Sequence, residues 1–107
     1  MKQIVEQLRK FRKERDWEQF HTPEALARAL IVEAAELNEL FLWGEDGSQE
    51  RIAEELADVF IYALNMADIC GFDVKEIIQN KIAKNAVKYP AKKEVKSEAV
   101  NPLPQKQ

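Results

Sequence analysis

The stretch L-A-R-A-L-I-V-E-A-A-E-L-N-E-L, residues 26–40, places carboxylates on the apolar face of a predicted helix. Its leucines recur at helical spacing and define one stripe for a core: Leu26, Leu30, Leu37 and Leu40. Glu33 lies three residues after Leu30 and four before Leu37, so it points into that stripe. Burying an ionised carboxylate is costly unless it is paired or binds a metal. The stretch therefore predicts a functional site as well as a core helix.

A second predicted helix repeats this pattern in R-I-A-E-E-L-A-D-V-F, residues 51–60, in which Glu55 and Asp58 lie three positions apart. If the two helices face each other, one acidic pair from each helix converges on a single site. The four residues are Glu33, Glu36, Glu55 and Asp58. A solvated acidic face is the alternative explanation, and we prefer it for the flanking residues Glu39, Glu50 and Glu54.

The predicted ligands offer oxygen only, with no His or Cys at matching spacing. Such a donor set favours Mg²⁺, Mn²⁺ or Ca²⁺ over Zn²⁺. The donor set alone leaves these three ions open.

The composition indicates one helical domain that is not built to bind a nucleic acid polymer. The chain has 107 residues, 46% of them hydrophobic, with three glycines and four prolines. Its net charge of −3 provides no general basic field for nucleic acid. Cys70 is the single cysteine, so no disulfide can form within the chain. With no signal peptide and no apolar run of about 20 residues, we expect a cytoplasmic protein that does not bind membranes.

Four helices are expected, over residues 2–15, 23–42, 49–70 and 73–88. Thr22, Ser48 and Asp73 are suited to cap the last three of them, and Gly71 is suited to end the third. No segment has the pattern of a strand, so the predicted fold is all-α and resembles a four-helix bundle. We place the domain at residues 1–90 and expect residues 91–107 to form a flexible or subunit-wrapping tail.

The two central helices, 23–42 and 49–70, are apolar over broader arcs than one partner face requires. An oligomer of helix pairs would bury the excess. We therefore expect a homo-oligomer.

The fourth helix carries hydrogen-bond donors along one face. Lys81, Asn85 and Lys88 share that face, and Tyr89 adds a hydroxyl at the helix end. Ammonium, amide and phenol donors suit phosphate oxygens. The alternative is a cationic C-terminus that complements the helix dipole.

Aromatic residues flank the helix over 23–42. Trp17 and His21 precede it, and Trp43 follows it. The two tryptophans could stack on the faces of a nucleobase, or they could cap the ends of the bundle as core residues. His21 is a candidate base contact, although a single His is more often a local hydrogen-bonding residue.

These motifs together resemble the MazG-like all-α nucleoside triphosphate pyrophosphatases over roughly residues 3–90. The resemblance lies in E-A-A-E (33–36), E-L-A-D (55–58) and K-x-x-x-N-x-x-x-Y-P (81–90). Within that family, R-D-W-E-Q-F-H-T-P (15–23) and E-L-F-L-W (39–43) resemble the dCTP pyrophosphatase branch.

The resemblance implies hydrolysis of a deoxynucleoside triphosphate, dCTP or a related one, to the monophosphate and pyrophosphate, as in nucleotide-pool cleaning. It implies that the four acidic residues bind Mg²⁺ and that Lys81 and Tyr89 hold phosphates. The base and sugar pocket would be lined by Trp17, His21, Trp43 and Asn85. Members of the family assemble as dimers or as tetramers built from two dimers, and we favour the tetramer.

The chain departs from the family at two places. Ala34 and Ala35 stand where relatives often carry Gly, and the link between Trp43 and Ser48 is short. The second departure bears on base selectivity more than on hydrolysis.

The general base is left open between Glu36 and Glu39. Two other functions are also open. One is a non-enzymatic helical oligomerisation module, and the other is a phosphoribosyl-nucleotide pyrophosphatase, against which the loop tryptophans argue.

Overall fold

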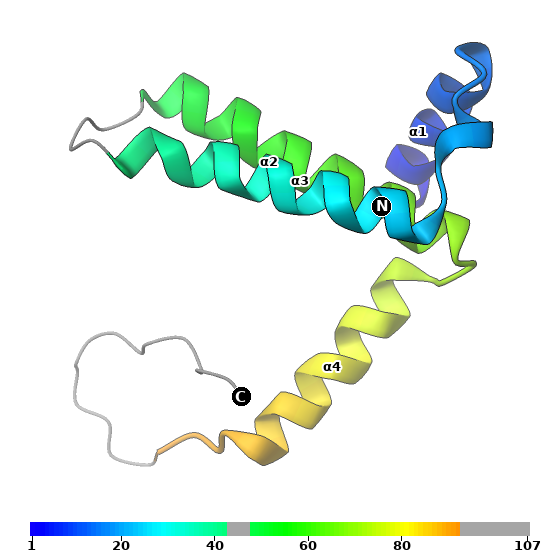
Figure 1. Cartoon of the computed structure of the whole chain (residues 1–107). Helices are drawn as coiled ribbons and strands as arrows, with labels where there is room; N and C mark the ends of the chain where they lie inside the picture. Colours follow the sequence, from blue (N-terminus) through cyan, green and yellow to red (C-terminus); the bar gives the residue numbers. More distant parts are fainter. Residues whose placement is uncertain (43–47, 93–107) are drawn as a thin grey trace.

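The computed structural model describes residues 1–42 and 48–92 and shows an all-helical chain over that range (Figure 1). The helices are α1 (Lys2–Glu14), α2 (Pro23–Leu42), α3 (Gln49–Ile69) and α4 (Val74–Lys88), with a short 3₁₀ helix, η1 (Glu18–Phe20), between α1 and α2. No strand occurs in the described residues, and each predicted helix is found within one residue at each end. The all-α prediction is confirmed. Only η1 was not expected.

Side-chain caps begin three of the helices, as the sequence predicted. In each case the cap oxygen accepts a hydrogen bond from the backbone N–H three residues later. Thr22 accepts from Ala25 at 3.1 Å, Ser48 from Arg51 at 3.1 Å and Asp73 from Glu76 at 3.0 Å. Each cap satisfies a backbone donor that the helix itself leaves free.

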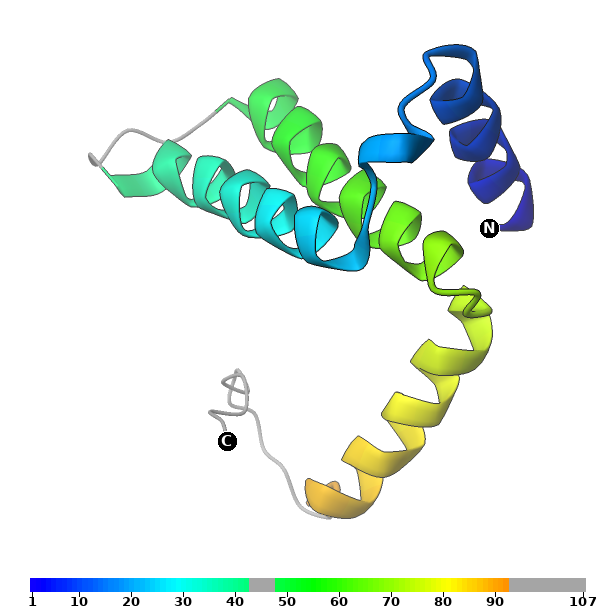
Figure 2. The same cartoon turned by 45° about the vertical axis from the view of Figure 1, so that its right-hand side comes forward.

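The turn at Gly71 ends α3 and directs the chain away from it. Gly71 has a φ of +78°, a left-handed conformation that disfavours any residue with a Cβ. The Gly71 N–H donates to the carbonyl of Asp68 at 3.0 Å, and the Phe72 N–H donates to that of Ala67 at 2.9 Å. These bonds close the last turn of α3, after which α4 leaves in a new direction (Figure 2).

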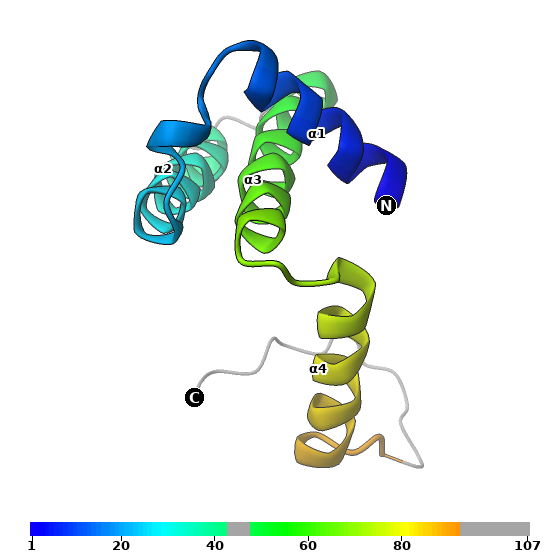
Figure 3. The ribbon, with the colours of Figure 1, turned by 90° about the vertical axis from the view of Figure 1, so that its right-hand side faces the viewer.

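The core lies mainly between α2 and α3, which run antiparallel and side by side (Figures 1 and 3). On α2, Leu26 and Leu40 are buried and Leu30 and Leu37 are partly buried, so the predicted leucine stripe is confirmed. The antiparallel pairing of the two helices places the middle of α2 opposite the first half of α3.

Apolar residues at helical spacing predict a buried stripe on α3 as well, and the structure confirms it only in part. These residues are Ile52, Leu56, Val59, Ala63, Met66 and Ala67. Leu56 and Ala63 are exposed, whereas Leu64 and Asn65 are buried beside Ala67. The reason is that α3 packs against α2 along its length and also against α1 near its C-terminal half, so its buried face shifts around the helix (Figure 3).

Helix α1 turns a partly polar face to α3. Val5 and Leu8 are partly buried, and the buried residue of this helix is Arg12. Ile4 and Phe11, the other apolar residues of this amphipathic helix, remain 46% and 43% exposed.

Helix α4 does not lie alongside the other helices of the same chain (Figures 1 and 2). Among the described residues it packs mainly against the end of α3, and most of its apolar side chains are exposed, Val87 by 83%. The antiparallel arrangement expected for α2 and α3 is confirmed, but α4 does not complete the bundle within one chain because the Gly71 turn directs it outward. Residues 93–107 lie outside the described part, so the domain limit at residue 90 and the predicted tail remain predictions.

None of the helices in residues 1–42 and 48–92 is long and apolar enough to cross a membrane.

Candidate metal centre

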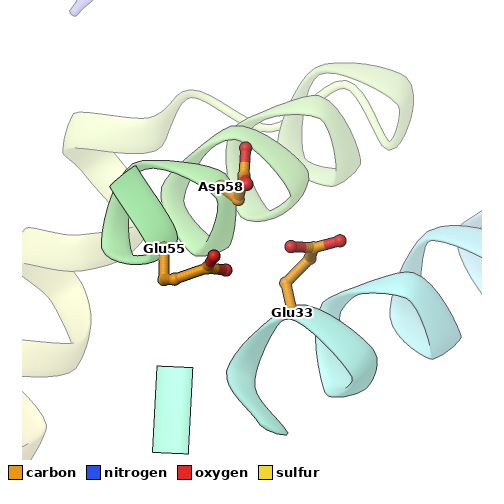
Figure 4. A group of neighbouring side chains, drawn as sticks. All are labelled: Glu33, Glu55 and Asp58. Atoms are coloured by element: carbon orange, nitrogen blue, oxygen red, sulfur yellow. The ribbon is translucent and has the colours of Figure 1, made fainter. Parts of the chain in front are cut away.

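Three of the four predicted metal ligands come together between α2 and α3. Glu33 comes from α2, and Glu55 and Asp58 come from successive turns of α3 (Figure 4). One carboxylate oxygen from each lies within 4.8 Å of the others, and all three side chains are partly buried. These three residues are called the carboxylate cluster below. The antiparallel register of α2 and α3 produces this convergence.

The cluster contains carboxylate oxygens that lack partners. Glu33 Oε1 and Glu55 Oε1 are both buried, and neither has a hydrogen-bond partner among the described residues. Burial, followed by the charge of Glu36, raises the pKa of Glu33 and also the pKa of Glu55. The charge of Asp58 raises both further. Since a buried carboxylate oxygen without a donor is costly, the cluster is suited to a cation that the oxygens could coordinate.

Glu36 lies beside the cluster rather than within it. Its side chain is exposed, yet it is close enough to raise the pKa values of Glu33 and Glu55. A residue three positions after Glu33 is rotated by about 60° around the helix, which accounts for its place at the edge. Glu39 is also exposed. The assignment of Glu36 as the fourth ligand, and of either residue as general base, stays a prediction.

Trp17 and His21 form an aromatic group with Phe11 at the start of α2. The Phe11 and Trp17 rings meet edge to face with centroids 5.5 Å apart, and the Trp17 and His21 rings are 6.2 Å apart. Burial, and then the charge of Arg12, lowers the pKa of His21, which favours the neutral imidazole. Trp43 lies outside the described residues, so the stacking of both tryptophans on one base stays a prediction.

The donors predicted on α4 are not brought to the cluster within one chain. Lys81 and Tyr89 are exposed and Asn85 is partly buried, on a helix that leads away from α2 and α3 (Figure 1). Their predicted roles as phosphate and sugar contacts would require α4 from another copy of the chain.

A polar contact that the sequence patterns did not predict joins α1 and α3. Arg12 is buried against Asn65 and Asp68. A signal existed in the sequence, since Arg12 lies four residues after Leu8 and seven after Val5, on the stripe that α1 turns inward. Arg12, like Glu33, is a charged residue in an apolar stripe and therefore needs a partner.

The antiparallel pair of α2 and α3 and the carboxylate cluster between them define the class of this protein, an all-α protein with a candidate divalent-cation site. The MazG-like family model matches residues 3–100. The chain therefore belongs to the MazG-like family.

Named relatives agree with this assignment. The chain is 44% identical over 91 residues to dCTP pyrophosphatase 1 of Homo sapiens and 44% identical over 90 residues to that of Mus musculus. These matches cover 76% and 75% of this chain, but only 54% and 53% of the relatives, so the chain spans about half their length. The resemblance to the family and its dCTP pyrophosphatase branch is confirmed.

A solved structure shows the same fold. The crystal structure of a pyrophosphatase from Archaeoglobus fulgidus superposes with a TM-score of 0.75 at 35% sequence identity. The match covers 85% of this chain and 93% of that one.

Proposed function

We propose that this protein is a metal-dependent nucleoside triphosphate pyrophosphohydrolase. Its substrate would be a deoxynucleoside triphosphate, dCTP or a related one, cleaved to the monophosphate and pyrophosphate. Membership of the MazG-like family and the names of the relatives support this activity. The observation that carries the proposal is the carboxylate cluster, with its two buried oxygens that have no partner among the described residues.

The cluster would hold Mg²⁺, or Mn²⁺ in its place. Glu33, Glu55 and Asp58 would supply the first ligands, and Glu36 at the edge would complete the set. An all-oxygen donor set of this kind suits these hard cations. When bound, such an ion neutralises charge on phosphate oxygens and lowers the pKa of a bound water.

A carboxylate at the edge of the cluster would accept the proton of the attacking water. Glu36 and Glu39 are both exposed, one and two turns after Glu33 on α2. A general base must be within hydrogen-bond reach of the water, and Glu36 is the nearer of the two to the cluster. The water oxygen would bond to phosphorus as the bridge between the α- and β-phosphates breaks.

The substrate pocket would be shared between copies of the chain. Trp17 and His21 lie before the first residue of α2, and Trp43 follows its last residue. A 20-residue helix spans about 30 Å, too far for one base to touch both ends. A base clamp made by both tryptophans therefore needs two chains, as does any contact of Lys81, Asn85 or Tyr89 with a substrate at the cluster.

Exposed apolar side chains give such an assembly a physical reason. They lie on α2, α3 and α4 and would be removed from water by a second copy: Ile31, Val32, Phe60, Ile77, Ile82 and Val87. We favour a tetramer built from two dimers. A cytoplasmic location and a role in cleaning the nucleotide pool are further proposals from the sequence.

The test is to incubate the protein with dCTP and Mg²⁺ and measure the release of pyrophosphate. Asp58→Asn keeps the shape of the side chain and removes a ligand charge, so it should lose at least 100-fold of the activity, about 2.7 kcal/mol of transition-state stabilisation. Glu54→Gln is the matched control on the exposed side of α3 and should retain the parent rate. Equal rates in all three proteins would show that the cluster is not the site. The rival function, a helical oligomerisation module, predicts no turnover of any nucleotide.

A further inference from the structure

Arg12 is a buried cation at the crossing of α1 and α3. Its side chain is buried, and its guanidinium donates from Nη1 to Asn65 Oδ1 at 2.6 Å and from Nη2 to Asp68 Oδ2 at 2.7 Å. Asn65 is buried too. Short bonds from a guanidinium to fixed acceptors impose a definite geometry as well as attraction. Arg12, Asn65 and Asp68 are called the α3 clamp below.

A second arginine supports the acceptor of this clamp. Arg9 donates from Nη2 to Asp68 Oδ1 at 2.5 Å and from Nε to Asp68 Oδ2 at 3.2 Å. Hydrogen bonding from Arg9, joined by Arg12, holds the pKa of Asp68 below its usual value despite burial. Asp68 therefore remains an ionised acceptor for Arg12 throughout the neutral range.

The backbone of Arg12 holds the segment that contains the proposed base contacts. Its carbonyl accepts from the Trp17 N–H at 3.0 Å and from the Arg15 N–H at 3.3 Å. Between them, Asp16 adopts a φ of +57° and reverses the chain. The Trp17 ring then packs on Phe11 and beside His21. The 15–21 segment thus folds back onto the turn of α1 that the side chain of Arg12 fixes to α3.

We propose that the α3 clamp is a positioning element that sets the orientation of Trp17 and His21 for recognition of the nucleobase. This inference rests on the proposed function. The clamp does not contact the base itself. It positions Trp17 and His21 through the Arg12 carbonyl, which accepts from the Trp17 N–H, and through the turn at Asp16. Apolar contacts between α1 and α3 would allow one helix to slide along the other, whereas a guanidinium bound to an amide and a carboxylate defines one register.

Steady-state kinetics on Asp68→Leu test the role in substrate binding. Base contacts are remote from the reacting phosphates, so they contribute about equally to the ground and transition states. The variant should raise KM for dCTP about two- to tenfold, the factor expected if the misplaced segment loses one hydrogen bond to the base, with kcat per folded protein within twofold. Asp68→Asn keeps one acceptor and should fall between the parent and Asp68→Leu. A merely structural clamp would lower the melting temperature and leave KM at the parent value.

The matched control is Lys10→Gln. Lys10 lies on α1 near the clamp, but it pairs at 3.8 Å with Glu14, on an exposed side of the helix. Removing its charge should leave KM unchanged. An equal rise of KM in Lys10→Gln and Asp68→Leu would show that the effect is not specific to the clamp contacts and would overturn the clamp.

A second measurement does not depend on activity. His21 is the single histidine of the chain, so its Hε1 resonance reports this position without ambiguity. The adjacent Trp17 ring shifts that resonance by an amount that depends on their relative orientation. At a pH where His21 is neutral, Asp68→Leu should move the signal, and Lys10→Gln should leave it in place.

The outcomes separate the two proposals. If the parent protein hydrolyses no deoxynucleoside triphosphate, the proposed function fails, while the His21 signal still decides whether the clamp orients the 15–21 segment. If the parent is active and folded Asp68→Leu shows the parent KM or an unmoved His21 signal, the clamp is overturned and the function stands. Should the leucine variant not fold, Asp68→Asn provides the same comparison with a KM increase of about twofold.

Discussion

Replacement of Glu33 by Gln should abolish stabilisation of the protein by Mg²⁺. Glu33 contributes one of the three oxygens that lie within 4.8 Å of one another, and it is the ligand supplied by α2. An ion bound between α2 and α3 links these two helices in the native state only. Binding to the native state alone stabilises it by about 2.7 kcal/mol when the free ion is 100-fold above its Kd.

This stabilisation corresponds to a large shift of the melting temperature. For a domain of roughly this size, 1 kcal/mol shifts Tm by about 4–8 °C, so saturating Mg²⁺ should raise the Tm of the parent by about 10 °C or more. Glu33→Gln should lose most of that response. Without metal, the variant should melt at the same temperature as the parent or higher, because one of several mutually repelling carboxylates has been neutralised.

Differential scanning calorimetry in EDTA and in Mg²⁺, at equal protein concentration, measures both effects. Glu54→Gln is the control, since Glu54 is exposed and precedes the cluster residue Glu55 on α3. Its Tm should respond to Mg²⁺ as the parent does. Retention of the full Mg²⁺ response in Glu33→Gln, or its loss in Glu54→Gln as well, would refute the proposed location of the metal.

Three further predictions concern pH, the base contacts and the α3–α4 turn. The native pKa values of Glu33 and Glu55 are raised, so the native state binds more protons than the unfolded state, and metal-free stability should fall as pH rises from the ordinary Glu range through the raised values. Thermal melts in EDTA at several pH values should show this fall in the parent and a smaller one in the Glu33→Gln/Glu55→Gln double variant. Identical pH dependence in the two proteins would contradict the prediction. Trp17→Ala should raise KM for dCTP about 5- to 150-fold with a smaller change in kcat, and His21→Ala should change the ratio of dCTP to dTTP turnover; a lower Tm with unchanged KM would instead make these residues structural. Gly71→Ala should destabilise the fold by about 1–2 kcal/mol in a denaturant titration, because a φ of +78° strains any residue that has a Cβ. No atom lies within 4 Å of that Cβ, so the cost comes from the backbone conformation and not from a clash; an unchanged midpoint would show that the left-handed turn is not required.

The helix boundaries could be predicted because their signals are local. Thr22, Ser48 and Asp73 each accept a hydrogen bond from a backbone N–H in the first turn of the helix that follows. Gly71 ends α3 because it can adopt a positive φ. The cluster could also be predicted, since the periodicity of each helix sets which carboxylates share a face. A short link then makes α2 and α3 antiparallel neighbours.

The direction of α4 and the buried face of α3 depend on contacts between helices and could not be read from one helix at a time. Leu56 follows the apolar period of α3, but it is 40% exposed because α1 and α2 together select a different face. Most apolar side chains of helix α4 remain exposed in the part of the chain that the structure describes. The α3 clamp depends on where α1 crosses α3, which periodicity alone does not specify.

The ³¹P NMR spectrum of dCTP incubated with the protein and Mg²⁺ shows directly which phosphate bond, if any, is cleaved. The proposed activity predicts that the three triphosphate resonances are replaced by those of dCMP and pyrophosphate in equal amounts, and that Asp58→Asn leaves dCTP intact. Unchanged dCTP with the parent protein, or conversion to dCDP and orthophosphate, would contradict it.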